Sequence, residues 1–121
     1  MTRRNLRKKI IFNLYKMDLL GKEQFNKDGE AGKVTADILS KLKEIDKRIE
    51  ENLFNYSLYR LAYLDKAIIR LATYEMAYTV EPKEVIINEA IEITKEYSDI
   101  DDKQKAFTNK LLDNIKKSFG D

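Results

Sequence analysis

Six basic side chains and no acidic ones lie within the first seventeen residues of this 121-residue chain. Together, these residues are Arg3, Arg4, Arg7, Lys8, Lys9 and Lys16. The remainder holds 17 basic and 21 acidic residues, so the net charge of +2 conceals a basic end on an acidic body. Such a concentration of positive charge is typical of surfaces that bind polyanions. Guanidinium groups there can donate hydrogen bonds to the phosphates or carboxylates of such a polyanion. A merely solvated basic face is the alternative.

Catalytic chemistry has few candidates in this chain. Histidine and cysteine are both missing, which excludes zinc sites of the usual kind and the Ser-His and Cys-His catalytic pairs. The four glycines form no phosphate-binding motif. Glu50 and Glu51 are adjacent, as are Asp101 and Asp102, but neighbours on a helix point about 100° apart and make poor acid/base couples. We therefore expect no enzyme, and neither a cofactor nor a metal.

Composition indicates one folded domain. Apolar residues make up 43% and charged residues 36%, a balance that excludes a largely disordered chain. No segment approaches the roughly 20 apolar residues needed to cross a bilayer, and the basic N-terminal segment lacks the separate apolar block of a signal peptide. With no cysteine there is no disulfide framework. These features predict a soluble, cytoplasmic protein that does not bind membranes.

Apolar residues at helical spacing predict an all-α bundle of six helices. We expect them at residues 2–19, 34–53, within 54–63 (short), at 64–78, from the break at 79–83 to 97, and at 103–118. Thr2 is a plausible cap of the first helix. Residues 21–33 contain three glycines and read as a loop, and the four aromatic residues of segment 54–63 are expected to fill the core.

Four separated segments resemble the NusB family of transcription antitermination factors. The first is RRNLRKKIIFNLY at residues 3–15, an arginine-rich helix that ends in Leu-Tyr. The others are LDKAIIRLATYEM (64–76), PKEVIINEAIEITKEY (82–97) and FTNKLLD (107–113). The four segments occur in the family's order and span nearly the whole chain. The resemblance implies a fold of two packed three-helix subdomains, in agreement with the helices predicted above.

The resemblance also implies a function. NusB proteins bind the boxA element of nascent RNA together with NusE, a small-subunit ribosomal protein. That complex makes RNA polymerase resistant to termination, chiefly on ribosomal RNA operons. In this chain, Arg3, Arg4 and Arg7 would contact RNA, with Lys8 and Lys9 extending the positive field less specifically. The family's last helix also borders the RNA, which adds Lys103, Lys105 and Phe107, although Phe107 fits a core position equally well.

Two further sets of residues carry over by resemblance. The family's face for its protein partner corresponds here to Tyr15, Asp18 and Asp65, as candidate contacts to NusE. The family's signature polar residues are interpreted as structural groups that bond between helices rather than contact ligands. These residues are Arg70, Glu75, Asn88, Glu89 and Asn109.

The chain departs from the family pattern in two places. Lys110 stands where the family has a glycine, so either the helices pack less closely there or Lys110 faces solvent. The linker between Tyr97 and Phe107 is about two residues longer than usual. Two alternatives to the antitermination reading stay open: a protein–protein scaffold, and an RNA-targeting module for a separate ribosomal RNA-modifying enzyme. Some relatives form homodimers, and the sequence leaves the oligomeric state open.

Overall fold

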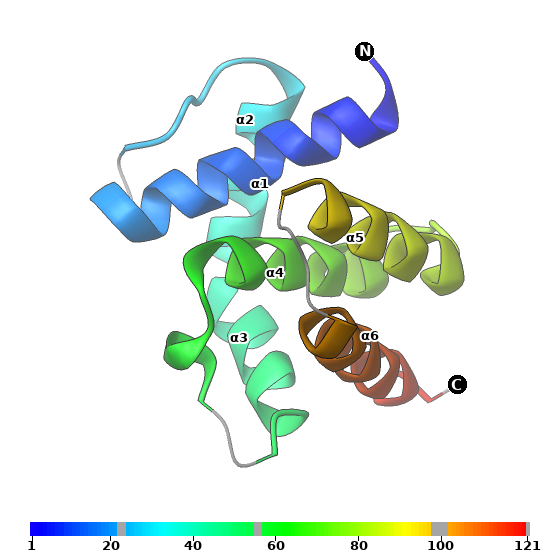
Figure 1. Ribbon diagram of the computed structural model, residues 1–121. Coiled ribbons are helices and arrows are strands. Elements are labelled where there is room, and N and C mark those ends of the chain that lie inside the picture. The colour runs from blue at the N-terminus through cyan, green and yellow to red at the C-terminus, as the bar shows by residue number, and fades with distance from the viewer. Residues whose placement is uncertain (22–23, 55–56, 98–101, 121) are drawn as a thin grey trace.

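The computed structural model describes residues 1–21, 24–54, 57–97 and 102–120, and within them the chain is helical with no strand (Figure 1). The helices are α1 (Arg3–Leu20), α2 (Gly29–Ser40), α3 (Leu42–Glu51), α4 (Tyr63–Tyr78), α5 (Lys83–Tyr97) and α6 (Asp102–Lys117), with a 3₁₀ turn η1 (Leu58–Arg60). The predicted all-α fold is confirmed. None of the described helices is both long and apolar enough to span a bilayer.

Helix α1 begins where its cap residue predicts. Thr2 has an extended backbone, and its side-chain oxygen accepts a hydrogen bond from the Asn5 backbone N–H at 3.1 Å. After Leu20 the chain turns at Gly21, whose φ of 110° is a conformation that other residues rarely adopt. Both ends of the helix that carries the basic cluster are therefore defined by local sequence.

The predicted single helix at 34–53 is in fact two helices, α2 and α3, separated at Lys41. This residue has φ −113° and ψ 8°, outside the regular helix. The apolar stripe continues across the break, which is why spacing alone did not reveal it. Helix α2 packs mainly against α1 and α3 mainly against α4, so the two helices bury their apolar faces against different partners.

Helix α2 also starts earlier than predicted, inside the segment read as a loop. Gly32 lies in its first turns, and a Cβ atom there would stand 2.2 Å from the backbone carbonyl group of Lys27. The glycine thus permits a close approach between the incoming chain and the helix, rather than loop flexibility.

Helix α4 is the centre of the fold. Every residue from Lys66 to Met76 is buried, and α4 packs against α1, α3, α5 and α6 (Figure 1). Helices α4, α5 and α6 also pack against one another as a three-helix group. The largest fully buried aliphatic side chains come from every helix: Ile11, Leu14, Ile38, Ile45, Ile49, Ile68, Ile69, Ile86, Ile93, Leu112 and Ile115. Burial around its whole circumference makes α4 the element against which α1 is positioned.

The aromatic residues between α3 and α4 do not fill the core as predicted. Phe54 and Tyr59 are 74% and 80% exposed, whereas Leu58 and Leu61 are each 6% exposed. In the 3₁₀ turn, residues three apart share one face, so the two leucines point inward together and Tyr59 points outward. Tyr56 lies outside the described residues.

A polar contact joins α4 to α2. The Tyr74 hydroxyl donates a hydrogen bond to Asp37 at 2.6 Å, and the Lys41 ammonium binds the other carboxylate oxygen at 2.6 Å. Burial, together with the bond to Asp37, raises the pKa of Tyr74 to about 12. This tyrosine therefore stays protonated at neutral pH and acts as a fixed donor between the two helices.

Candidate nucleic-acid interface

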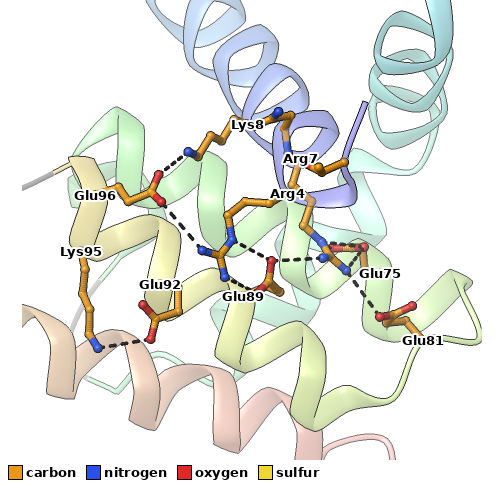
Figure 2. Close-up of polar contacts among 11 residues, drawn as sticks. Arg4, Arg7, Lys8, Glu75, Glu81, Glu89, Glu92, Lys95 and Glu96 are labelled. Atoms are coloured by element: carbon orange, nitrogen blue, oxygen red, sulfur yellow. Dashed lines mark hydrogen bonds and ion pairs between the residues drawn. The ribbon is translucent and has the colours of Figure 1, made fainter.

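On one side of α1, basic side chains meet glutamates from α4, α5 and the turn between them (Figure 2). The Arg4 guanidinium donates to both carboxylate oxygens of Glu89, with Nε 3.0 Å from Oε1. The hydrogen bond from Arg4 holds the pKa of Glu89 below its usual range, so Glu89 stays ionised. Arg3 pairs with Glu81 at 2.9 Å, although its own side chain remains 66% exposed.

Arg7 is the most deeply buried cation of this group. Its side chain is 6% exposed, and its Nε and Nη2 each donate to Glu75 at 3.0 Å. Glu81 and Glu89 lie 3.9 and 3.6 Å away. Burial would lower the pKa of Arg7, but the bonds to Glu75 outweigh it and the pKa is raised. Its donors are directed into the protein and bonded to glutamates, so an RNA contact by Arg7 would require these bonds to open, and the predicted contact stays a prediction.

Lys8 and Arg4 share a further carboxylate at the outer edge of the group. The Lys8 ammonium contacts Glu96, and Nη1 of Arg4 lies 3.8 Å from the same side chain (Figure 2). These three side chains are 30–39% exposed, so solvent and ligands can reach them. An RNA phosphate could therefore contact Arg4 or Lys8, but only in competition with a glutamate.

Sequence reasoning missed Glu81 and Glu96 as partners of the basic cluster. A signal existed for Glu96, because it follows Glu89 by seven residues and so shares its face of α5. Glu81 lies in the turn before α5, where no helical periodicity could place it.

A groove of about 410 Å³ lies between the start of α4 and the start of α6, and brings two predicted sets together. Asp65, Lys103 and Phe107 line it. Lys103 is exposed, whereas Lys105 and Phe107 are half-buried, and Phe107 packs against the core. In the part of the chain that the structure describes, Asp65 has neither a hydrogen bond nor an ion pair, and burial raises its pKa. One groove therefore holds residues predicted for RNA and for a protein partner.

The other two residues predicted to contact a protein partner differ in availability. Tyr15 is half-buried, and its ring lies nearly parallel to that of Phe12, with ring centroids 6.4 Å apart. Asp18 accepts hydrogen bonds from Arg70 at 3.0 and 3.2 Å and lies 3.9 Å from the Lys66 ammonium. Its carboxylate is thus engaged inside the fold, and its predicted contact with a protein partner stays a prediction.

Three of the predicted structural polar residues bond between helices. Arg70, 6% exposed, donates to Asp46 of α3 and Asp18 of α1, while Glu75 and Glu89 bind Arg7 and Arg4 of α1 as described above. Asn88 and Asn109 are exposed instead, and no hydrogen bond from either side chain to another helix is present among the described residues. Both lie on the sides of α5 and α6 that face away from the core. Lys110 is exposed too, so the cation faces solvent.

Sequence comparisons place this all-α bundle among transcription antitermination factors. Residues 4–117 match the NusB family. The transcription antitermination protein NusB of Bacillus licheniformis is 36% identical over 127 residues, covering 96% of this chain and 97% of that protein. The NusB protein of Bacillus thuringiensis is 38% identical over 129 residues, with 96% and 98% coverage. The chain belongs to the NusB family.

Solved structures agree with this assignment. NusB from T. maritima superposes with a TM-score of 0.78 at 30% identity, covering 97% of this chain and 92% of that one. A chain from the crystal structure of a plectonemic RNA supercoil gives a TM-score of 0.80 at 25% identity, with 97% and 95% coverage. The family resemblance drawn from the four sequence segments is therefore confirmed, and it extends over the full fold.

Proposed function

We propose that this chain binds single-stranded boxA-type RNA of nascent ribosomal RNA transcripts together with NusE, as a non-catalytic adaptor on RNA polymerase. The observation that carries the proposal is the cationic helix α1 within a full-length match to antitermination proteins. The structural neighbour from an RNA supercoil crystal independently favours RNA as the ligand.

In this proposal, RNA contacts the solvent-accessible cations of α1, whereas the buried cation stabilises the packing of α1 against α4. The side chains of Arg3, Arg4 and Lys8 are 66%, 38% and 30% exposed, and they would contact phosphates. Lys103 would extend the contact at the start of α6. Arg7 acts only indirectly, since its bonds to Glu75 hold α1 against α4.

The carboxylate of Asp65, which has no ion pair among the described residues, supports a basic protein partner at the groove between α4 and α6. An acid that is partly desolvated and has no cation of its own gains most from a cation brought by a partner. NusE, the partner implied by the family resemblance, is a ribosomal protein and suits such a site. Tyr15, in the C-terminal half of α1, would supply an aromatic contact to the same partner.

Titration of a labelled single-stranded boxA-type RNA, with and without NusE, tests the proposal. We expect binding by the chain alone and tighter binding when NusE is present. The logarithm of affinity should fall with the logarithm of salt concentration with a slope of about −2 to −3, if three or four phosphates are neutralised at about 0.7 each. A scaffold that does not bind RNA would show no such titration. RNA binding without any gain from NusE would instead favour the RNA-targeting module.

The variant Asp65→Asn tests the partner site separately. Because burial raises the pKa of Asp65, the ionised carboxylate destabilises the fold once the pH exceeds the ordinary pKa of an aspartate. Its position in the first turn of α4 opposes this effect through the helix dipole. We therefore expect the free energy of unfolding to change by less than about 1 kcal/mol. The gain in RNA affinity from NusE should fall about tenfold, equivalent to about 1.4 kcal/mol. Asp113→Asn, at an exposed position of α6, is the matched control; equal NusE gains in both variants would exclude Asp65 from the interface.

A further inference from the structure

The second side of α1 carries cations that do not meet glutamates. Lys9 is exposed, and no ion pair involves it or Lys16 among the described residues. On the side that faces α5, each cation has a carboxylate within 4 Å. Among the described residues, the cations of α1 that lack an ion pair therefore lie on the side turned toward α2. The list of basic residues in the sequence does not show this difference between the two sides.

This second side forms one wall of a groove. The groove has a volume of about 430 Å³ and lies between α1 and the segment that leads into α2. Its volume is within the range of roughly 300–1,000 Å³ common for clefts that hold small-molecule-sized groups. Its α1 wall includes Arg3, Leu6, Lys9, Phe12 and Lys16.

Phe12 is the aromatic centre of that wall. Phe12 is 57% exposed. The Lys16 ammonium lies 5.3 Å from its centroid, and Lys9 precedes it by three residues on the same helix face. An exposed aromatic ring between cations is the arrangement with which proteins bind single strands, through base stacking and phosphate contacts.

We propose that single-stranded RNA passes through this groove, with one base stacked on Phe12 and the adjoining phosphates on Lys9 and Lys16. This inference rests on the proposed RNA-binding function and assigns a path for the strand. Arg3 connects the two sides of α1, because it both lines the groove and pairs with Glu81. A strand that reaches Arg3 can therefore continue along α1 into the groove.

The acidic residues of the groove restrict where phosphates can lie. Asp28 and Glu30 stand on the opposite wall, at the start of α2. They repel phosphates from that wall, so the strand's backbone must follow α1. On the side facing α5, by contrast, each phosphate must compete with a glutamate that is already bound. Charge alone thus favours the groove for the first phosphate contacts.

Two sets of variants in the full chain test the groove. In the first, Lys9→Gln plus Lys16→Gln should weaken binding of a labelled single-stranded boxA-type RNA roughly tenfold and lower the magnitude of the salt slope by about 1.4. Lys43→Gln plus Lys47→Gln, at exposed positions of α3, removes the same charge elsewhere and should leave both values unchanged.

In the second set, Phe12→Leu should weaken RNA binding roughly 5- to 150-fold, while Phe12→Tyr keeps a stacking ring and should bind RNA like the parent chain.

The outcomes separate this proposal from the proposed function. If the parent chain binds RNA and the groove variants bind as tightly as the α3 control, the groove is wrong and the function stands. If the parent chain does not bind RNA with or without NusE, both are overturned. If the groove variants bind RNA normally but lose only the gain from NusE, the groove binds protein, and the RNA path is refuted. Circular dichroism spectra that match the parent confirm that each variant is folded.

Discussion

Glu75→Ala is expected to lower the free energy of unfolding by about 3 kcal/mol, as measured by urea denaturation at pH 7. The substitution removes the carboxylate that binds Arg7 through its two closest contacts, both at 3.0 Å. The guanidinium is only 6% exposed and would keep just the longer contacts to Glu81 and Glu89. A buried charge that loses its main partner keeps its full desolvation cost, which is why one substitution has so large an effect.

The double variant Arg7→Met plus Glu75→Met is the control for this prediction. Because two apolar side chains of similar length replace both charges, we expect it to recover most of the lost stability. A Glu75→Ala loss below about 1 kcal/mol would show that Glu81 and Glu89 suffice to hold Arg7. The Arg7–Glu75 pair also affects how RNA-binding experiments are interpreted. Arg7→Glu would place a carboxylate against three glutamates, so a loss of RNA binding in that variant would reflect a damaged fold.

Arg70→Met is expected to lower the free energy of unfolding by about 3–5 kcal/mol. Arg70 donates four hydrogen bonds of 2.8–3.2 Å, two to Asp46 of α3 and two to Asp18 of α1. These carboxylates are 21% and 16% exposed, and without Arg70 the nearest cation to Asp18 is Lys66 at 3.9 Å. The variant therefore leaves two partly buried acids with little compensation and removes the contact that joins three helices.

Lys95→Met is the matched control for Arg70→Met, since it also replaces one cation of an ion pair by methionine. Lys95 pairs with Glu92 three residues away, with both side chains 43–49% exposed. Exposed pairs of this kind contribute about 0.2–0.5 kcal/mol, so we expect a change within that range. Similar losses in both variants would mean that burial does not strengthen the Arg70 contacts, and would refute the central role assigned to this residue.

Helical periodicity predicted most of the fold because each helix buries a regular stripe. Helix α1 is an example: Ile10, Leu14 and Met17 recur at spacings of four and three residues, and all are at most 3% exposed. The division of α2 from α3 could not be predicted in the same way. It depends on α2 and α3 packing against different helices, and that information is not contained in the local pattern around Lys41.

The candidate site was less predictable, because residue type does not reveal which partner a charge will meet. Arg4 and Arg7 look alike in sequence, yet one is partly accessible and the other is buried against Glu75. Lys8 and Lys9 also look alike in sequence, yet Lys8 contacts Glu96 while Lys9 has no carboxylate partner among the described residues. Whether Arg4 or Arg7 is accessible depends on the positions of glutamates that lie 68 to 85 residues further along the chain.

The long sequence separation between these cations and their glutamates affects the charge of the chain during its synthesis. Arg7 meets Glu75 across 68 residues and Arg4 meets Glu89 across 85. At a synthesis rate of about 5–20 residues per second, the ribosome needs roughly 4–17 s after adding Arg4 to reach Glu89. Throughout that interval the growing chain carries its cations without the glutamates that later neutralise them. Until those glutamates are made, the N-terminal segment carries its full positive charge and attracts polyanions through it.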